Sequence, residues 1–255
     1  MVVEVEFYTP RFVYVGAQSD YPNIQEGIDA ANDFDTVMIE AGTYNITESE
    51  TNDTPMSTRI LLDDKIITIT TAHPNNPSAT QIIGGFEITN VDRRTVIQGM
   101  TITGNYVTGD GLNGNTPPRN PHEDGMNGGH IGGGGMRLHN FGWQSWGNVD
   151  PNFIEILPDP ESGSPTVRNV IFEDCSVDAG DGGNGASGGE GGWGGWAHGG
   201  AVSVGPNSQP LFINCEFRNC WVEGGDGGNG GNNPPGIGGN WGDPDHPRWY
   251  WAPPG

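Results

Sequence analysis

One eleven-residue pattern occurs twice in the chain, first as Pro165-Thr166-Val167-Arg168-Asn169-Val170-Ile171-Phe172-Glu173-Asp174-Cys175 and again as Pro210-Leu211-Phe212-Ile213-Asn214-Cys215-Glu216-Phe217-Arg218-Asn219-Cys220. A glycine-rich pattern follows each copy, as Gly180-Asp181-Gly182-Gly183-Asn184-Gly185 and then Gly225-Asp226-Gly227-Gly228-Asn229-Gly230. Both patterns recur after 45 residues. A fixed period with apolar residues alternating at one end predicts a coil of stacked β-strands, in which each turn buries its apolar face against its neighbours.

Short apolar runs continue this organisation outside the repeat. They are bounded by Gly, Asn, Asp or Pro, which favours strands over helices. The predicted strands lie within residues 1–15 and at 36–40, 60–62, 66–70, 81–83, 96–97, 100–103, 135–138, 153–156, 167–172, 201–204 and 211–217. Residues 41–44 are predicted to be a turn. A single amphipathic helix is predicted over 22–31, where Ile24, Ile28 and Ala31 have helical spacing and Pro22 stands near the start.

Composition supports one elongated all-β domain over residues 1–255. Gly 44 and Pro 20 of 255 residues exceed ordinary usage and disfavour helical bundles and doubly wound sheets. Within the domain we expect amino-terminal strands and a capping helix at 1–35, compact turns at 36–103 and turns with long glycine-rich insertions at 104–230. Residues 231–255 are aromatic and proline-rich, and they are expected to form a carboxyl-terminal cap or a contact segment.

The net charge of −22 excludes several classes of partner. Lys and Arg number 10 against 32 Asp and Glu, so nucleic acid and anionic membrane surfaces are not expected partners. No apolar run approaches the length of a membrane span, and no signal peptide is visible after Met1. The chain is then either cytosolic or an exported protein whose signal is not part of this chain. We expect the second, an extracellular or cell-surface protein.

Two stretches resemble a known family. Residues 21–31, Tyr-Pro-Asn-Ile-Gln-Glu-Gly-Ile-Asp-Ala-Ala, followed by residues 35–44, resemble the amino-terminal cap and first coil of right-handed parallel β-helix proteins of the pectate-lyase-like superfamily. Residues 133–136, 164–169, 199–202 and 207–217 resemble repeats of bacterial surface proteins akin to the polymorphic outer-membrane proteins. The resemblance implies a right-handed parallel β-helix, in a superfamily that includes polysaccharide lyases, glycoside hydrolases and adhesins.

Catalytic candidates gather around the largest insertion. A lyase or hydrolase needs acids, a base and a cation that stabilises a developing anion. The residues of those types are Asp110, His122, Glu123, Asp124, His130, Arg137 and His139. Most of them fall in glycine-rich loops, whereas enzymes of the resembled superfamily use side chains clustered on one strand face. The competing interpretation is that they are solvated loop groups, and no catalytic set is favoured.

The glycine-rich repeats admit three interpretations. Calcium is one, because hard oxygen ligands lie among glycines at Asp181, Asn184, Glu190, Asp226 and Asn229. Ordinary turn positions for Asp and Asn beside Gly are another. In the third, the glycine segments pack against one another as extended, polyproline-II-like strands. No cofactor is otherwise required.

Tryptophans gather in the second half of the chain and are candidates for contacts with a glycan or with another copy of the chain. The alternative is that they cover a small core within the loops. The set is Trp143, Trp146, Trp193, Trp196, Trp221, Trp241, Trp249 and Trp251.

Two of the three cysteines, Cys175 and Cys220, lie one repeat apart. In a coil they become vertical neighbours at about 4.8 Å, a separation that a disulfide tolerates. A buried ladder of free thiols is the alternative, and Cys215 takes the place of Val170 as a core residue.

These patterns favour a non-catalytic structural or adhesive protein over an enzyme. The expected partners are extracellular polysaccharide or further copies of the chain, joined head to tail or through edge strands. The rival function is a polysaccharide lyase or glycoside hydrolase with its site near residues 122–139.

Overall fold

The computed structural model describes residues 8–46, 59–107, 125–129, 131–139, 163–186, 189–205 and 208–230. The described strands form five sheets, and every strand pairing among them is parallel. The chain outside these ranges includes residues 1–7 of the predicted strand region 1–15, the predicted strand at 153–156 and the aromatic segment 231–255.

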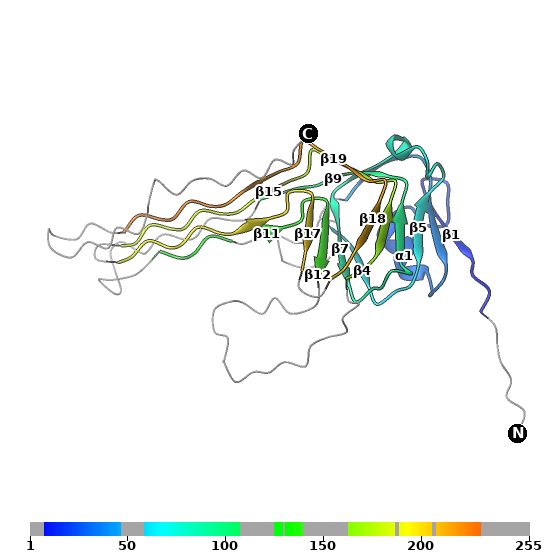
Figure 1. Cartoon of the computed structure of the whole chain (residues 1–255), viewed down its shortest axis with the longest axis horizontal. Coiled ribbons are helices and arrows are strands. Elements are labelled where there is room, and N and C mark those ends of the chain that lie inside the picture. The colour runs from blue at the N-terminus through cyan, green and yellow to red at the C-terminus, as the bar shows by residue number, and fades with distance from the viewer. Residues whose placement is uncertain are drawn as a thin grey trace, which may run out of the picture.

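Three sheets form the body of the molecule (Figure 1). The first has the order β1 (Phe12–Val15), β2 (Thr36–Ile39), β5 (Thr68–Thr71), β8 (Val96–Gln98), β13 (Thr166–Arg168), β18 (Leu211–Ile213). The second has the order β3 (Gly42–Asn45), β6 (Thr80–Ile83), β9 (Thr101–Thr103), β14 (Ile171–Glu173), β19 (Glu216–Arg218). The third has the order β4 (Arg59–Asp63), β7 (Gly85–Thr89), β12 (Met136–His139), β17 (Val202–Val204).

Two smaller sheets lie where the later turns lengthen. The fourth sheet contains β10 (Asn105–Val107), β15 (Ser176–Asp178) and β20 (Trp221–Glu223). The fifth contains β11 (Ile131–Gly132) and β16 (Ala197–His198). A short 3-10 helix, η1 (Pro77–Ala79), precedes β6.

Consecutive strands belong to different sheets, and each strand pairs with its counterpart one turn along the chain. Thus β2, β3 and β4 are followed by β5, β6 and β7, which join the same three sheets in the same sequence. The later turns repeat this path with the fourth and fifth sheets inserted between the second and the third. The backbone therefore returns repeatedly to the same sheets, and the predicted all-β class with parallel strands is confirmed for the described residues.

Residues that are 45 positions apart in the sequence pair with each other between the last two described turns. Thr166 pairs with Leu211, Ile171 with Glu216, and Ser176 with Trp221. Each apolar residue of the repeat therefore lies directly against its copy. The rings of Phe172 and Phe217, for example, stack with centroids 5.0 Å apart.

The strand predictions at 167–172 and 211–217 are wrong in one respect, since each run forms two strands joined by a sharp corner. Asn169 and Asn214 stand at these corners with φ of 49° and 51°. Asn tolerates this left-handed conformation better than most residues. The side chains also bridge the two turns, since Asn214 Nδ2 donates to Asn169 Oδ1 at 2.8 Å.

Other differences involve very short strands. The predicted turn at 41–44 is largely strand β3, because the chain continues directly from the first sheet into the second. Strands β7, β10, β11, β15, β16 and β20 were not predicted. Four of them have only two or three residues beside glycine, which is too short for alternation to be visible.

The predicted helix is α1 (Ile24–Ala30). Asn23 caps its start by accepting a hydrogen bond from the Glu26 N–H at 2.9 Å. The ammonium group of Lys65 closes the other end, since it donates to the carbonyls of Ile28, Asp29 and Ala31. Among the described helices, none is long and apolar enough to cross a membrane.

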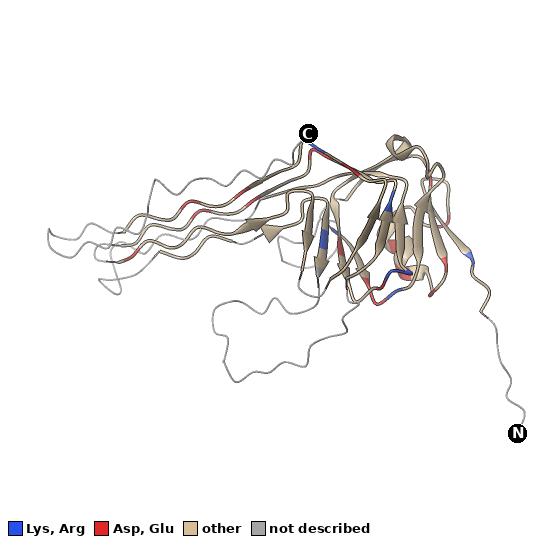
Figure 2. Ribbon diagram, viewed as in Figure 1, with Lys and Arg blue, Asp and Glu red and all other residues tan. Residues whose placement is uncertain are grey.

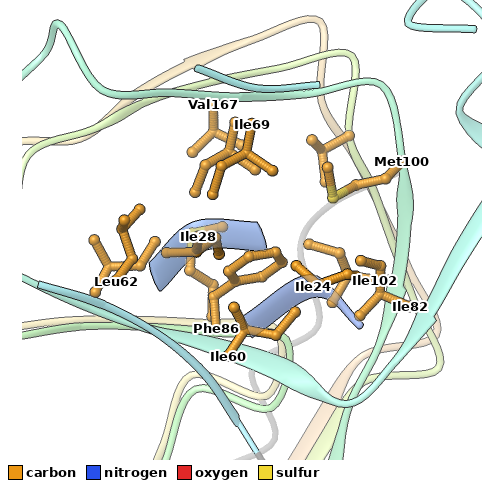
Figure 3. Close-up of a cluster of buried hydrophobic side chains, with 14 of the residues drawn as sticks. Ile24, Ile28, Ile60, Leu62, Ile69, Ile82, Phe86, Met100, Ile102 and Val167 are labelled. Atoms are coloured by element: carbon orange, nitrogen blue, oxygen red, sulfur yellow. The ribbon is translucent and has the colours of Figure 1, made fainter. Parts of the chain in front are cut away.

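The core runs up the inside of the coil as vertical rows of apolar side chains. Ile60, Phe86 and Met136 form one row, and all three are almost fully buried. Ile24 and Ile28 of α1 extend into the same cluster beside Phe86 (Figure 3). The helix thus covers the amino-terminal part of the core that has no preceding turn to pack against.

Asp35 ties the amino-terminal segment to this core and gives a prediction for acid stability. Its buried carboxylate accepts hydrogen bonds from Tyr8 Oη, from the N–H groups of Arg11 and Asn32, and from Arg11 Nε. Burial opposes the charge, but the combined hydrogen bonds lower the pKa of Asp35 below its ordinary value.

A carboxyl whose folded-state pKa is lowered stabilises the fold above its unfolded pKa, near 4, and this contribution is lost as the pH falls. We expect Asp35→Asn to lower the unfolding free energy at pH 7 by roughly 1–3 kcal/mol. The loss should shrink as the pH approaches 3, and denaturant titrations at pH 7, 5 and 3 measure it. An equal loss at all three values would contradict this role of the Asp35 charge.

Candidate binding arm

Four glycine-rich segments form an arm that leaves the body of the coil. They are residues 125–129, 180–186, 189–195 and 224–230, and we call them together the glycine arm. Figure 1 shows them running side by side away from the three large sheets. Residues 180–186 and 224–230 follow β15 and β20, whereas 125–129 and 189–195 lead into β11 and β16.

The backbone of segment 189–195 donates a hydrogen bond to segment 180–186 at every third residue. The pairs are Gly189 to Ala186 at 2.7 Å, Gly192 to Gly183 at 2.7 Å and Gly195 to Gly180 at 2.8 Å. Polyproline-II helices have three residues per turn and no internal hydrogen bonds. A three-residue period of bonds between segments is therefore the pattern of polyproline-II helices packed side by side.

The other segments obey the same period. Segment 125–129 bonds to segment 189–195, since the N–H groups of Gly125 and Gly128 donate to the carbonyls of Glu190 and Trp193 at 2.8 Å each. It also bonds to segment 180–186, since the N–H groups of Gly183 and Gly180 donate to the carbonyls of Met126 at 2.8 Å and Gly129 at 3.2 Å. Segment 224–230 bonds through Gly225 to Gly195 at 3.0 Å and Gly228 to Gly192 at 2.8 Å. The glycine-rich segments therefore pack against one another as extended, polyproline-II-like strands, which was the third interpretation of the repeats.

Segment 189–195 has three faces, and only one of them has room for side chains. A Cβ placed on Gly192 would lie 2.0 Å from the Met126 carbonyl oxygen, and one on Gly191 would lie 1.9 Å from that of Gly228. Gly195 and Gly194 repeat these two contacts one helical turn later. The third position of each triplet points outward, and in this segment it is filled by Glu190 and Trp193, with Trp196 following.

Trp193 and Trp196 form an exposed aromatic stripe. Their side chains are 72% and 55% exposed, although their backbones are fixed by hydrogen bonds to the neighbouring segment. Three residues of polyproline-II helix span about 9 Å, so the two indoles project from one side at this spacing. The backbone N–H of Trp193 also donates a hydrogen bond to Asn127 Oδ1 at 2.9 Å, which further fixes this residue.

The other predicted contact tryptophans are placed differently. Trp221 is 47% exposed and opens β20, at the base of the arm. Trp143, Trp146, Trp241, Trp249 and Trp251 lie outside the described residues.

The predicted calcium ligands include two side chains that bond to backbone. Asp181 Oδ1 accepts the N–H of Asp226 at 2.7 Å, and Asn184 Oδ1 accepts that of Asn229 at 2.8 Å. The polyproline-II backbone needs such outside partners because it has none of its own. Within the described ranges, no three His, Cys, Asp or Glu side chains are grouped to share an ion. Calcium binding by these residues and by Glu190 stays a prediction.

A buried arginine supports the base of the arm. The guanidinium of Arg59 lies over the ring of Tyr106 in β10, 3.9 Å from its centroid, and donates to the Gly132 carbonyl in β11 at 3.1 Å. Burial lowers the pKa of Arg59. The contact links β4 of the body to both strands that flank the insertion.

Of the predicted catalytic residues, only Arg137 has a described side chain. It lies on β12 opposite Glu87 of β7, and burial lowers its pKa while the nearby Glu87 charge opposes that shift. His139 ends β12. Asp110, His122, Glu123, Asp124 and His130 lie outside the described residues, so the proposed catalytic grouping stays untested.

The cysteines occupy corner positions in the last two described turns. Cys175 and Cys220 each precede a strand of the fourth sheet, in register one above the other, and Cys215 lies at the neighbouring corner. All three are free thiols in this structure. The disulfide between Cys175 and Cys220 therefore stays a prediction about oxidising conditions.

The charges are distributed unevenly. Figure 2 shows acidic positions on the described arm, and within its four segments these are Asp181, Glu190 and Asp226, with no Lys or Arg among the same residues. The Lys and Arg positions that the figure colours blue lie along the ribbon of the body and at the base of the arm. The tryptophan stripe therefore lies in an acidic setting.

No family model matches the sequence, and no curated protein matches it. Among solved structures, the pectin methylesterase from Aspergillus niger in deglycosylated form is similar at 12% identity and a TM-score of 0.31. The match covers 84% of this chain and 57% of the esterase chain, so this chain spans less than two thirds of the length of that protein. A likeness at this level carries no inference about activity.

Proposed function

We propose that the protein is an extracellular, non-catalytic binding module, in which a right-handed parallel β-helix carries a rigid glycine arm that attaches to saccharide. The observation that carries this proposal is the pair of exposed indoles, Trp193 and Trp196, on a backbone held by hydrogen bonds at every third residue. The β-helix assignment rests on the all-parallel coil and on the residues that resemble the superfamily.

Fixed, exposed tryptophans are well suited to contact sugars. An indole supplies a large flat surface, and its ordering cost is low because the side chain has only two rotatable bonds. The backbone cost has already been met during folding, so the stripe is preorganised. A pyranose ring offers an apolar face of C–H groups to such a surface, and a chain of sugars can occupy both indoles at once.

The acidic arm selects among saccharides. Glu190 lies one helical turn from Trp193 on the same outward face, and the whole chain carries a net charge of −22. A uronate polymer would be repelled, whereas a neutral or amino-sugar polymer would not. The proposed ligand is therefore a neutral or cationic glycan, and self-association remains a second use of the same surface.

The test is titration of the full chain with three oligosaccharide classes, followed by calorimetry. Cello-oligosaccharides represent neutral glycans, chitosan oligomers represent amino sugars and oligogalacturonates represent uronates. We expect binding of one of the first two, and Trp193→Ala and Trp196→Ala should each weaken it at least tenfold. Trp221→Ala, which removes an exposed indole outside the stripe, should change the affinity less than twofold.

Two results would contradict the proposal. One is absence of binding to every oligosaccharide, and the other is equal binding by the wild type and by Trp193→Ala. Product formation during the titration, seen as new reducing ends or unsaturated sugars, would instead support the rival lyase or hydrolase. Loss of that turnover in Arg137→Ala would then establish the rival site.

A further inference from the structure

The strongest feature that the binding proposal leaves unused is the pair Cys175 and Cys220. Each follows a corner residue in the left-handed conformation, Asp174 with φ of 51° and Asn219 with φ of 50°. The two cysteines therefore enter the coil with the same local geometry, one turn apart. The backbone confirms their stacking, since Trp221 N donates to the Cys175 carbonyl at 3.0 Å.

The two thiols lie close enough to react. Neighbouring parallel strands are separated by about 4.8 Å, which falls within the Cα separation of ordinary disulfides. Cys220 Sγ also reaches down to the turn beneath, 3.6 Å from the Phe172 carbonyl oxygen, and so lies on the side of its turn that faces Cys175. The interaction of each thiol with the other lowers the pKa of Cys220 and raises that of Cys175.

The solvent exposure of the two thiols indicates which of them reacts first with an oxidant. Cys175 is fully buried, whereas Cys220 is half-buried in the last described turn. Partially exposed thiols that ionise readily are the ones that attack disulfides. Cys220 is therefore the entry point for an oxidant, and Cys175 is placed to complete the exchange.

The last described turn is also the part of the body that a covalent link would change most. Its strands β18, β19 and β20 are each paired on one side only among the described strands. Its core is open as a result, since Phe217 is 46% exposed whereas Phe172, one turn below and stacked on it, is fully buried. A bridge from Cys220 to Cys175 would hold this turn against the next one.

We propose that Cys175 and Cys220 are a redox staple, which a small-molecule disulfide of the glutathione class closes. The Cys220 thiolate attacks one sulfur of that disulfide and releases one thiolate, leaving a mixed disulfide on Cys220. Cys175, after losing its proton, attacks the Cys220 sulfur and releases the second thiolate. The two cysteines are oxidised, and the small disulfide is reduced to two thiols that carry the two protons.

The experiment compares the full chain after incubation with oxidised and with reduced glutathione. Free thiols are alkylated, and the peptides are mapped by mass spectrometry. We expect a linked peptide joining Cys175 to Cys220 only after oxidation, with Cys215 alkylated in both samples. Hydrogen exchange over residues 211–223 should become at least tenfold slower in the oxidised protein, because the staple suppresses local opening of the last turn.

Cys215→Ser is the matched control, because Cys215 lies in the same turn but above Val170, with no thiol beneath it. This variant should keep both responses to oxidation, whereas Cys220→Ser should lose both. The staple is refuted if oxidised glutathione leaves Cys175 alkylated, if Cys215 is the linked residue, or if exchange over residues 211–223 is unchanged. The mapping uses the wild-type chain, so it decides the matter even where a variant folds poorly.

Discussion

Gly192→Ala is expected to open the glycine arm while leaving the sheets folded. Its added Cβ would lie 2.0 Å from the Met126 carbonyl oxygen, a contact that backbone on both sides must move to relieve. The shift also breaks the bond from Gly192 N to the Gly183 carbonyl and disturbs the bond that the Gly192 carbonyl accepts from Gly228. Overpacking together with lost hydrogen bonds should cost roughly 3 kcal/mol within the arm.

Limited proteolysis measures this effect directly. In the variant, cleavage within residues 180–195 should become at least tenfold faster, while the melting temperature of the body stays within a few degrees of the wild type. Gly227→Ala is the matched control, since it is also an arm glycine and the nearest atom to its new Cβ is 3.9 Å away. Equal cleavage of the two variants would contradict the close packing of the arm.

Phe86→Ala should have the largest effect on the body of the coil. The ring is fully buried at the centre of a row between Ile60 and Met136, and it also meets the helix α1 (Figure 3). Removing a buried phenylalanine side chain costs about 3–5 kcal/mol, because neighbours held by the stacked turns cannot collapse into the cavity. The loss should appear as a lower midpoint in denaturant titrations.

Phe12→Ala provides the comparison for Phe86→Ala. Phe12 lies on the edge strand β1 and is 57% exposed, so its truncation should cost less than 1 kcal/mol. Comparable losses in the two variants would show that the core does not lie inside the coil as described.

The pairing of strands 45 residues apart could be predicted from the sequence because its signal is repetition. Thr166 and Leu211 differ chemically, yet the interval between their two copies of the pattern gave their pairing without any propensity rule. The corners between consecutive strands were harder to predict from the sequence. Asn169 lies inside an apolar run, and nothing in the run itself distinguishes a corner asparagine from a strand residue until the second copy, Asn214, stacks on it.

The ordered packing of the glycine segments could be predicted from the sequence, but which residues of each segment make the contacts could not. Ordered packing of the glycine segments was one of three interpretations, yet the triplet in which two glycines precede one side chain was not used. Asp181 and Asn184 occupy the same position of this triplet as Trp193 and Trp196, so the period marks which residues carry side chains on the arm. It does not distinguish Asp181 and Asn184, which bond to neighbouring backbone, from the two exposed indoles, because that difference depends on which segments lie alongside.

Arg59 shows what a single sequence cannot supply. It stands at the start of a strand, in a position that alternation assigns to the outer face, and it would ordinarily be counted as solvated. The insertion that begins with Tyr106 returns through Gly132 and buries it. Burial of this kind depends on where a long excursion rejoins the body, and local pattern does not encode that.

Amide hydrogen exchange followed residue by residue by NMR tests the central claim that the glycine segments form a hydrogen-bonded bundle. Slow exchange is expected at Gly192 and Gly195, whose N–H groups bond to the Gly183 and Gly180 carbonyls, together with Gly183 and Gly228 in the flanking segments. Exchange at these four amides at the rate of an unstructured peptide, while the sheet amides remain protected, would contradict it.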